Sequence, residues 1–217
     1  IRTLLFEQTQ EVGATGSIVV SNNNDFRVWA KDGEDFFHVG EDGHVEFRYL
    51  PAGEYKLVEV PPIGYIAKDE ISVVLTDRNG VSNPKMVTVE NRPTGIKLQK
   101  IDASSNNPLM GAGFEIKVKT DSGFESLKFV KNSDGSFFYD PQGNVTELMV
   151  DGMGEIALYG VPLGDIWVEE TTVPDGYFPI SAQQLTVTKE MNSDAPFEMT
   201  IKNHRFVKLG MNSDWWE

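Results

Sequence analysis

The stretch VPLGDIWVEE, residues 161–170, decides how this chain folds. After its Pro-x-Gly turn, the apolar residues Ile166 and Val168 alternate with residues of the opposite face, which is the pattern of a half-buried β-strand. A closely similar stretch, LPAGEYKLVE, occupies residues 50–59, and a Pro-x-Gly-Tyr sequence follows each copy. The chain therefore contains an internal repeat of one β-rich unit.

Short alternating segments and turn signals surround both copies of the repeat. Residues 45–49 and 156–158 alternate in the manner of strands, and Asp-Gly or Asn-Gly pairs at 42–43, 79–80 and 151–152 mark turns. No segment sustains the periodicity of an amphipathic helix. The pattern predicts an all-β protein made of two tandem β-sandwiches with Greek-key connections.

The repeat also predicts how the chain is divided. We expect one domain over residues 15–93 and a second over 94–204, in an elongated arrangement because the link between them is short. Residues 119–151 have no counterpart in the first copy and are expected to form an extra hairpin or a long loop. Residues 1–14 are interpreted as a linker or the end of a preceding domain, and residues 205–217 as the start of a further domain or a docking tail.

The composition excludes several classes of function. A net charge of -14 in 217 residues argues against nucleic acid or an anionic membrane as a partner, because both repel acidic surfaces. The absence of cysteine excludes disulfides and thiol catalysis. With three histidines and no His-Glu-x-x-His or Gly-x-Ser-x-Gly motif, the sequence predicts no enzyme with turnover, no metal site and no cofactor.

Three polar residues end alternating apolar runs in the second half of the chain. Lys100, Glu170 and Asn203 each have the strand parity of the apolar residues before them, so each is expected to point into a core. Isolated buried charges are too costly to keep. These groups must therefore be tightly paired, neutralised or chemically consumed, and a plain hydrogen-bonded cluster is one of the possible outcomes.

The order of motifs around these residues is informative. Residues 94–102 read TGIKLQKID and residues 108–114 read PLMGAGF; the strand ending at Glu170, its Pro-x-Gly-Tyr and the closing Asn203 follow. In this order they resemble the Cna B-type, SpaA-like domain of Gram-positive surface adhesins and sortase-assembled pilins. The resemblance covers residues 94–204 well and residues 15–93 in part.

This resemblance implies an immunoglobulin-like β-sandwich and a covalent cross-link. Many members of the family form an autocatalytic isopeptide bond between a lysine on the first strand and an asparagine on the last, promoted by a glutamate. By position, the resemblance implies Lys100 and Asn203 as the cross-linked pair and Glu170 as the promoting, catalytic residue. Glu169 has the opposite strand parity and is expected in solvent.

The chemistry of such a bond is consistent with these residue types. Attack on an amide requires an uncharged amine, and burial lowers the pKa of a lysine. A buried, protonated Glu170 can donate a hydrogen bond to the Asn203 carboxamide oxygen and move protons as ammonia leaves. A fold that holds amine and carbonyl together replaces about 7 to 11 kcal/mol of the barrier with prepaid entropy.

The first domain departs from the family pattern. Glu59 and Asn91 match the glutamate and the asparagine, but Asn22 stands where the pattern requires a lysine. We interpret these three residues as degenerate equivalents of the site. The sequence therefore predicts no isopeptide bond within residues 15–93.

The resemblance implies a structural stalk or anchor module of a pilin or adhesin, secreted and attached to the cell wall of a Gram-positive bacterium. Its expected partners are other pilin or surface-protein subunits and, in one alternative, a host matrix protein. That alternative is a ligand-binding adhesin that uses exposed aromatic residues of the 119–151 insertion. The aromatic residues concerned are Phe124, Phe129, Phe137, Phe138 and Tyr139.

Overall fold

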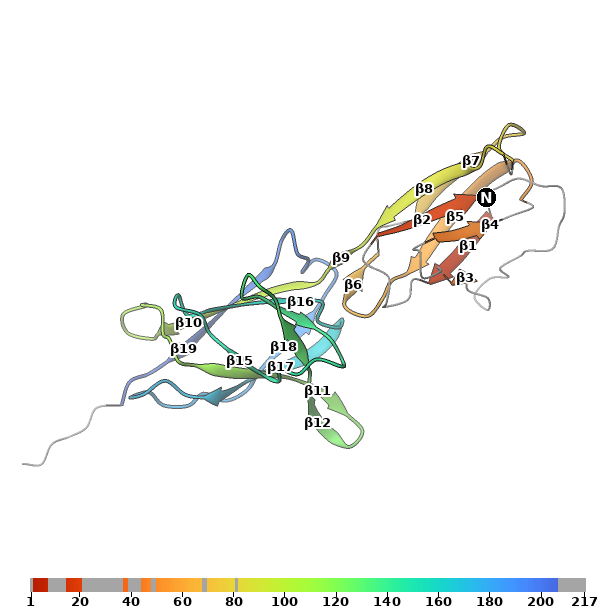
Figure 1. Ribbon diagram of the computed structural model, residues 1–217. Coiled ribbons are helices and arrows are strands. Elements are labelled where there is room, and N and C mark those ends of the chain that lie inside the picture. Colours follow the sequence, from red (N-terminus) through yellow and green to blue (C-terminus); the bar gives the residue numbers. More distant parts are fainter. Residues whose placement is uncertain are drawn as a thin grey trace, which may run out of the picture. The chain divides into compact units, whose positions relative to one another are not determined.

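The computed structural model describes residues 2–7, 15–20, 37–38, 44–47, 50–67, 70–80 and 82–206. Every regular element in these ranges is a β-strand, and they contain no helix that could span a membrane. The chain divides into two compact units, Ile1–Thr94 with Gly160–Leu163 and Gly95–Tyr159 with Gly164–Glu217 (Figure 1). The prediction of an all-β chain is confirmed, and the arrangement of the two units relative to each other stays a prediction.

The first unit consists of three groups of strands in its described part. A four-stranded sheet has the order β3-β1-β5-β7, a three-stranded sheet has the order β4-β2-β8, and β6 pairs with β9. The strands are β1 (Arg2–Glu7), β2 (Thr15–Val20), β3 (Phe37–His38), β4 (His44–Phe47), β5 (Gly53–Val60), β6 (Tyr65–Ile66), β7 (Ile71–Leu75), β8 (Lys85–Glu90) and β9 (Arg92–Pro93).

Strand β5 is the first copy of the repeat, and its alternation positions the core of this unit. Tyr55, Leu57 and Glu59 are buried, whereas the residues between them are more exposed. The Tyr55 hydroxyl donates a 2.6 Å hydrogen bond to the Pro51 carbonyl, so the turn before the strand is held by a residue inside it. The core cluster comprises Phe47, Leu50, Tyr55, Leu57, Val73, Leu75 and Val89.

Within its described residues, the second unit is built from two larger sheets. One has the order β13-β14-β16-β10-β19, and the other has the order β12-β11-β17-β18 with β15 added beside β11. The strands are β10 (Gly95–Asp102), β11 (Gly113–Thr120), β12 (Gly123–Ser126), β13 (Phe129–Lys131), β14 (Phe137–Tyr139), β15 (Glu147–Met149), β16 (Glu155–Tyr159), β17 (Gly164–Thr172), β18 (Gln183–Val187) and β19 (Phe197–Asn203).

The first and last strands of this unit lie side by side. Strand β10 pairs in parallel with β19, and the register places Lys100 opposite Ile201 and Asp102 opposite Asn203. On its other edge β10 pairs with β16 in the antiparallel sense. A parallel first-to-last pairing cannot be made by a hairpin, so it depends on the whole domain between the two strands.

The corresponding pairing in the first unit runs in the opposite sense. Strand β2 is antiparallel to β8, with Thr15 opposite Glu90 and Val20 opposite Lys85. Its first residue, rather than its last, therefore lies beside the end of β8 that leads to Asn91. Strands β5 and β17 are thus equivalent in the two copies of the repeat. The strands that pair with the last strand, β2 and β10, run in opposite senses relative to it.

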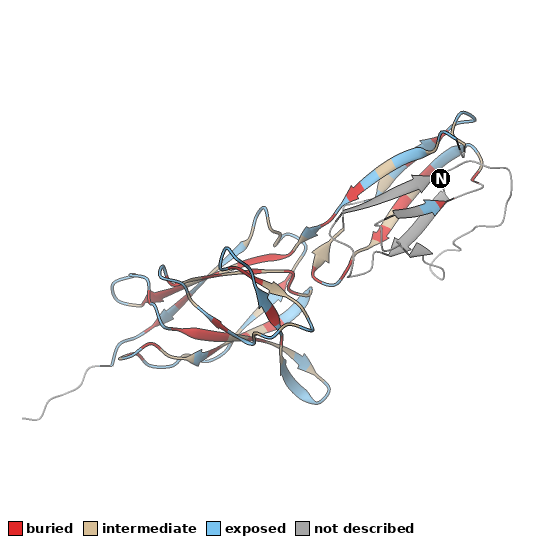
Figure 2. Cartoon of the chain, in the orientation of Figure 1, coloured by how far each residue is buried: buried red, intermediate tan, exposed pale blue. Residues whose placement is uncertain are grey.

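The core of the second unit lies between the inner faces of its two sheets. Buried side chains recur at every second position of β10, β11, β16 and β17, and Figure 2 shows this burial along the strands. The buried apolar residues at these alternating positions are Ile96, Leu98, Phe114, Ile116, Ile156, Leu158, Ile166 and Val168. The apolar residues that alternate in the sequence are thus the ones that form the core.

Residues 119–151 differ from the expected single hairpin or long loop. They contribute four short strands, of which β12 and β15 join β11 while β13 and β14 extend the sheet of β10. Phe129 and Leu148 are fully buried and anchor this segment to the domain. The apolar residues inside the segment are the reason that it folds onto the sandwich.

Candidate functional site

Three strands from the two facing sheets each bring one polar side chain into the interior of the second unit. Lys100 lies on β10, Asn203 is the last residue of β19, and Glu170 lies on β17. As whole residues, backbone included, they are 1%, 0% and 8% exposed. The period-two alternation of each strand gives these residues the inward direction of their apolar neighbours.

The three groups are in mutual contact. The Nζ atom of Lys100 donates a hydrogen bond to Oδ1 of Asn203 and lies 2.8 Å from Oε1 of Glu170. The Nδ2 atom of Asn203 lies 2.9 Å from Oε1 and 3.0 Å from Oε2 of Glu170. The structure thus places an amine, a carboxyl group and a carboxamide within hydrogen-bond distance of one another, away from solvent.

The surroundings of Lys100 disfavour its charged form. Burial lowers the pKa of the Lys100 amine, and the hydrogen bond and charge of Glu170 oppose this effect without cancelling it. The Nζ atom also lies 5.4 Å from the ring centroid of Phe114, a residue that is fully buried. The amine therefore faces an aromatic ring on one side and the two polar partners on another.

The carboxyl group of Glu170 is oriented differently from the expectation. Its two oxygens face the nitrogen of the Asn203 carboxamide, while the carboxamide oxygen accepts its hydrogen bond from Lys100. The backbone amide of Ile180 also donates to Oε2 at 3.3 Å. Glu170 is therefore placed to act on the leaving nitrogen of an amide exchange rather than on the oxygen.

The first unit contains half of the same arrangement. Nδ2 of Asn91 donates a 2.5 Å hydrogen bond to Oε1 of Glu59, and both residues are buried. Burial raises the pKa of the Glu59 carboxyl, and the hydrogen bond from Asn91 opposes this effect. The other oxygen, Oε2, is buried and has no hydrogen-bond partner within the described ranges.

No lysine within the described ranges forms an ion pair with Glu59. Lys56 pairs instead with Glu70 at 2.5 Å near the surface, in agreement with its strand parity. Asn22 lies outside the described residues, so its interpretation as the degenerate lysine position stays a prediction. The antiparallel direction of β2 does not provide the geometry that brings Lys100 to Asn203 in the second unit.

The aromatic residues of the insertion do not form one exposed patch. Phe129 and Phe137 are buried, and Phe138 and Tyr139 are half-buried. Phe124 is 58% exposed, and its ring meets Trp167 edge to face with centroids 5.0 Å apart. The segment thus uses most of its aromatic residues to pack onto its own domain.

Two contacts of the site were not anticipated from the sequence. Phe114 ends the motif at residues 108–114, but nothing in that motif indicates that its ring faces Lys100. The hydrogen bond from the Ile180 amide to Glu170 is not predictable from the sequence, because every residue other than proline has the same backbone amide. The alternation of β11, which contains Phe114, was the one available clue to its inward direction.

A family model described as SpaA, prealbumin-like fold domain, matches residues 13–91 and 94–205. No curated protein matches the sequence.

Several solved structures of pilins resemble the chain. The group B streptococcus pilus 2b backbone protein is 24% identical, with 63% of this chain and 48% of that chain covered and a TM-score of 0.41. The shaft pilin SpaA from Lactobacillus rhamnosus GG is 20% identical over 68% of this chain and 60% of that one, with a TM-score of 0.43. The minor pilin GBS52 of Streptococcus agalactiae is 17% identical, with 76% of this chain and 65% of that chain covered and a TM-score of 0.43. The chain thus spans about half the length of the first of these proteins.

Proposed function

The chain belongs to the SpaA family of prealbumin-like fold domains, and from this membership we propose that it is a stalk or anchor module of a Gram-positive pilin or surface adhesin. The resemblance inferred from the sequence is confirmed by the match. We further propose that an isopeptide bond between Lys100 and Asn203 cross-links the second domain, with boundaries at residues 94–204. The observation that supports the bond is that Lys100 contacts both Asn203 and Glu170 in the buried interior of the domain.

The proposed reaction is an intramolecular amide exchange. The uncharged Nζ of Lys100 attacks Cγ of Asn203, the bond from Cγ to Nδ2 breaks, and ammonia leaves. One amine and one primary amide become one secondary amide and one ammonia, so no oxidant, metal or cofactor is required. The reaction occurs once per molecule and has no turnover.

Glu170 is suited to move the protons of this exchange. Its Oε1 atom lies 2.8 Å from the attacking nitrogen and 2.9 Å from the leaving nitrogen. One carboxyl oxygen can therefore accept a proton from the amine of Lys100 and deliver it to the departing ammonia. A proton transfer from lysine to glutamate also replaces two buried charges by two neutral groups, which a dry environment favours.

A plain hydrogen-bonded cluster is the competing interpretation of the same contacts. It would keep an amine in the core whose charged form burial disfavours. A covalent bond removes that amine altogether and leaves an amide, which is cheaper to bury. The chemistry of the residues and the family membership together support the bond.

We propose that the bond gives a cysteine-free surface domain resistance to force. It joins β10 to β19, which are the first and last strands of the domain and the two that tension would separate. In the chain-entropy view, closing a loop of about 100 residues stabilises a fold by roughly 4 to 5 kcal/mol. We therefore propose an extracellular, cell-wall-attached location and other pilin or surface-protein subunits as partners.

The adhesin alternative has less support from the contacts. It requires the aromatic residues of the insertion to face solvent together, and the contiguous patch is missing among those residues, all of which the structure describes. Phe124 alone among them is largely exposed. A host matrix protein as ligand thus stays a prediction.

Intact-mass measurement of the whole chain tests the proposal. We expect a mass one ammonia below that of the sequence, and the full mass for Glu170→Ala. The matched control is Glu169→Ala, which removes the neighbouring carboxylate on the opposite face of β17 and should leave the shortened mass unchanged. A wild-type chain of full mass would refute the bond, and a loss of two ammonias would refute the prediction for residues 15–93.

A further inference from the structure

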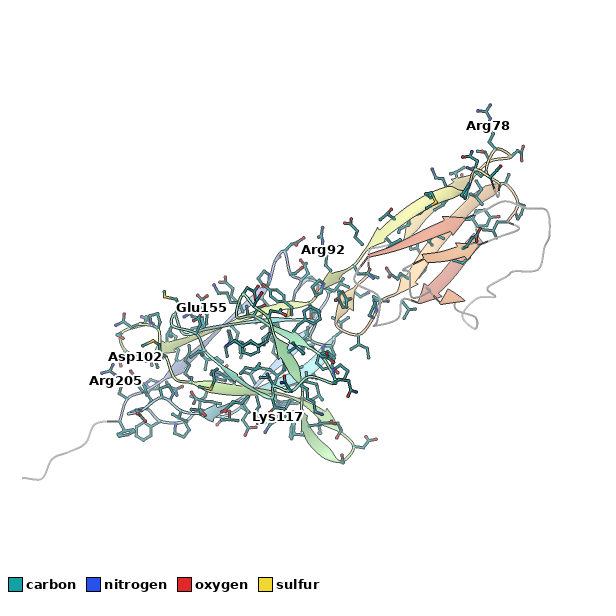
Figure 3. All side chains as sticks on the ribbon, viewed as in Figure 1. Arg78, Arg92, Asp102, Lys117, Glu155 and Arg205 are labelled. Atoms are coloured by element: carbon teal, nitrogen blue, oxygen red, sulfur yellow. The ribbon has the colours of Figure 1, made fainter. Side chains whose placement is uncertain are left out.

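A second polar cluster lies at the end of the domain where β10 and β19 terminate. Oδ2 of Asp102 accepts a 2.7 Å hydrogen bond from the hydroxyl of Tyr177 and a 2.9 Å hydrogen bond from Nε of Arg205. Nε of Arg205 is also 2.7 Å from the Tyr177 hydroxyl, and its guanidinium lies 5.3 Å from the ring centroid. Figure 3 shows Asp102 and Arg205 next to each other at this end.

Asp102 is buried, although it is an acid. Only 2% of the residue is exposed, and its Oδ1 atom accepts the backbone amides of Ser104 and Ser105 at 2.8 and 2.9 Å. Together with the two bonds to Oδ2, these contacts satisfy both carboxylate oxygens. The Tyr177 hydroxyl, the two amides and Arg205 hold the pKa of Asp102 well below its usual range, so the carboxylate stays charged.

Each segment that supplies a reactive group also supplies one member of this cluster. Asp102 follows Lys100 on β10 with one residue between them, and Arg205 follows Asn203 in the same way. Tyr177 lies in the loop after β17, the strand that carries Glu170. The cluster therefore links the same three segments that must meet for the Lys100–Asn203 bond to form.

Backbone hydrogen bonds reinforce the link. The amide of Phe178 donates to the carbonyl of His204 at 2.9 Å, and the amide of Phe206 donates to Gly176 at 3.0 Å. These bonds flank the bridge between Tyr177 and Arg205. The chain that leaves β19 is thus held against the loop of β17 by main-chain and side-chain contacts together.

Such a link adds to the constraint from β10, which pairs with β19 from Phe197 to Asn203. Among the described residues β19 is the edge strand, with β10 as its one neighbour. A slip of one residue along β10 moves a side chain by about 3.3 Å and turns it to the opposite face. Either change would remove the Asn203 carboxamide from the reach of Lys100.

We infer that Asp102, Tyr177 and Arg205 are positioning residues that set the register of β19 against β10 and thereby the rate at which the Lys100–Asn203 bond forms. This inference rests on the proposed isopeptide reaction. None of the three residues contacts the reacting atoms. Once the bond exists, it fixes the register itself, and the cluster becomes dispensable for holding the two strands.

The test is the time course of ammonia loss during synthesis of the whole chain. The chain is made by cell-free translation, quenched in denaturant at intervals and weighed by mass spectrometry. The variants are Tyr177→Phe, which removes one hydroxyl, Asp102→Asn, which keeps an oxygen for the turn amides, and Arg205→Met. The control is Asp134→Asn. Asp134 also accepts a hydrogen bond from a backbone amide, that of Ser136, but it lies in an exposed turn of this domain.

We expect the three cluster variants to lose ammonia about tenfold more slowly than wild type. Each variant loses a charge-assisted hydrogen bond, and the reaction depends on holding the amine and the carboxamide at reacting distance. Asp134→Asn should react at the wild-type rate, and Arg205→Lys should restore most of the rate lost in Arg205→Met. The pH dependence of the rate should keep its midpoint in Tyr177→Phe, because positioning leaves the Lys100 amine unchanged.

The outcomes separate this inference from the proposed function. A wild-type chain that never loses ammonia refutes the isopeptide reaction and the positioning role together. A wild-type chain that reacts while the cluster variants react equally fast refutes the positioning role alone. The near-ultraviolet circular dichroism of each cluster substitution is also measured in a Glu170→Ala background, where no bond can form. If the slow variants lose this signal there, the cluster has a purely structural role and the inference is overturned as well.

Discussion

Nζ of Lys100 and Oε1 of Glu170 lie 2.8 Å apart between two side chains that are 1% and 0% exposed. A charged pair at this depth is costly because water no longer solvates either partner. In the reaction proposed above, proton transfer between them, followed by conversion of the amine into an amide with Asn203, removes that cost. This relationship connects the stability of the second domain to the chemistry proposed for it.

Replacement of Lys100 should destabilise the second domain strongly. Lys100→Met keeps much of the side-chain volume but removes the nucleophile, so we expect the free energy of unfolding to fall by about 4 to 5 kcal/mol from loss of the proposed cross-link. Urea denaturation of the whole chain, with the transition of the second domain followed by tryptophan fluorescence, measures the change. Lys117→Met is the control: its ion pair with Glu169 lies near the surface, and its loss should cost about 1 kcal/mol or less. Equal effects of the two substitutions would contradict the prediction.

An unreacted Lys100 should make stability depend on pH. In Glu170→Gln the amine persists, and burial holds its pKa below the ordinary 10.5 of the unfolded chain. Between the folded pKa and 10.5 the unfolded state binds more protons, so the unfolding free energy should rise with pH across this window. Wild type, in which the proposed bond converts the amine into an amide, should lack this rise. Chemical denaturation at a series of alkaline pH values compares the two, and parallel curves would count against the bond.

The Glu59 carboxyl should weaken the first domain at neutral pH. Burial raises its pKa above the ordinary 4.5, so the folded state binds more protons between 4.5 and the folded pKa, and stability falls as pH rises through that window. Glu59→Gln keeps an oxygen for Asn91 and removes the charge. We expect it to stabilise the domain at pH 7 by about 1 kcal/mol, because the buried charge is removed, and to abolish this pH dependence. A loss of stability in thermal unfolding at pH 7 would contradict this prediction.

The aromatic residues of the insertion should divide into core and surface. Phe129 is fully buried, so Phe129→Ala should cost about 3 to 5 kcal/mol of unfolding free energy. Phe124 is largely exposed and contacts Trp167 edge to face, so Phe124→Ala should cost about 1 kcal/mol. Denaturation curves of the two variants provide the comparison. A larger cost at Phe124 than at Phe129 would reverse our view of how this segment packs.

Much of the fold was predictable from local pattern. The alternation in β5, β10, β17 and β19 is visible in the sequence because one face of each strand is apolar. That alternation also indicated that Lys100, Glu170 and Asn203 point inward. The direction of a side chain relative to its own strand is a local property, and local properties are readable without a structure.

Other features were not predictable, because they depend on pairing between distant segments. The direction of β2, the distribution of residues 119–151 over two sheets and the orientation of the Asn203 carboxamide all differ from or go beyond what the pattern indicated. Arg205 shows the same limit. Its spacing from Asn203 is evident in the sequence, but its partner Asp102 lies far away in the chain.

The sequence by itself determined that this protein is built of strands in two repeated units, and that an amine, an acid and an amide must face a core, because strand periodicity assigns each side chain to a face. Only the tertiary structure decided that these groups meet. The parallel register of β10 with β19 and the approach of β17 from the facing sheet bring them within hydrogen-bond distance. Contacts between segments so distant in the chain arise from the packing of the whole domain, which no local pattern encodes.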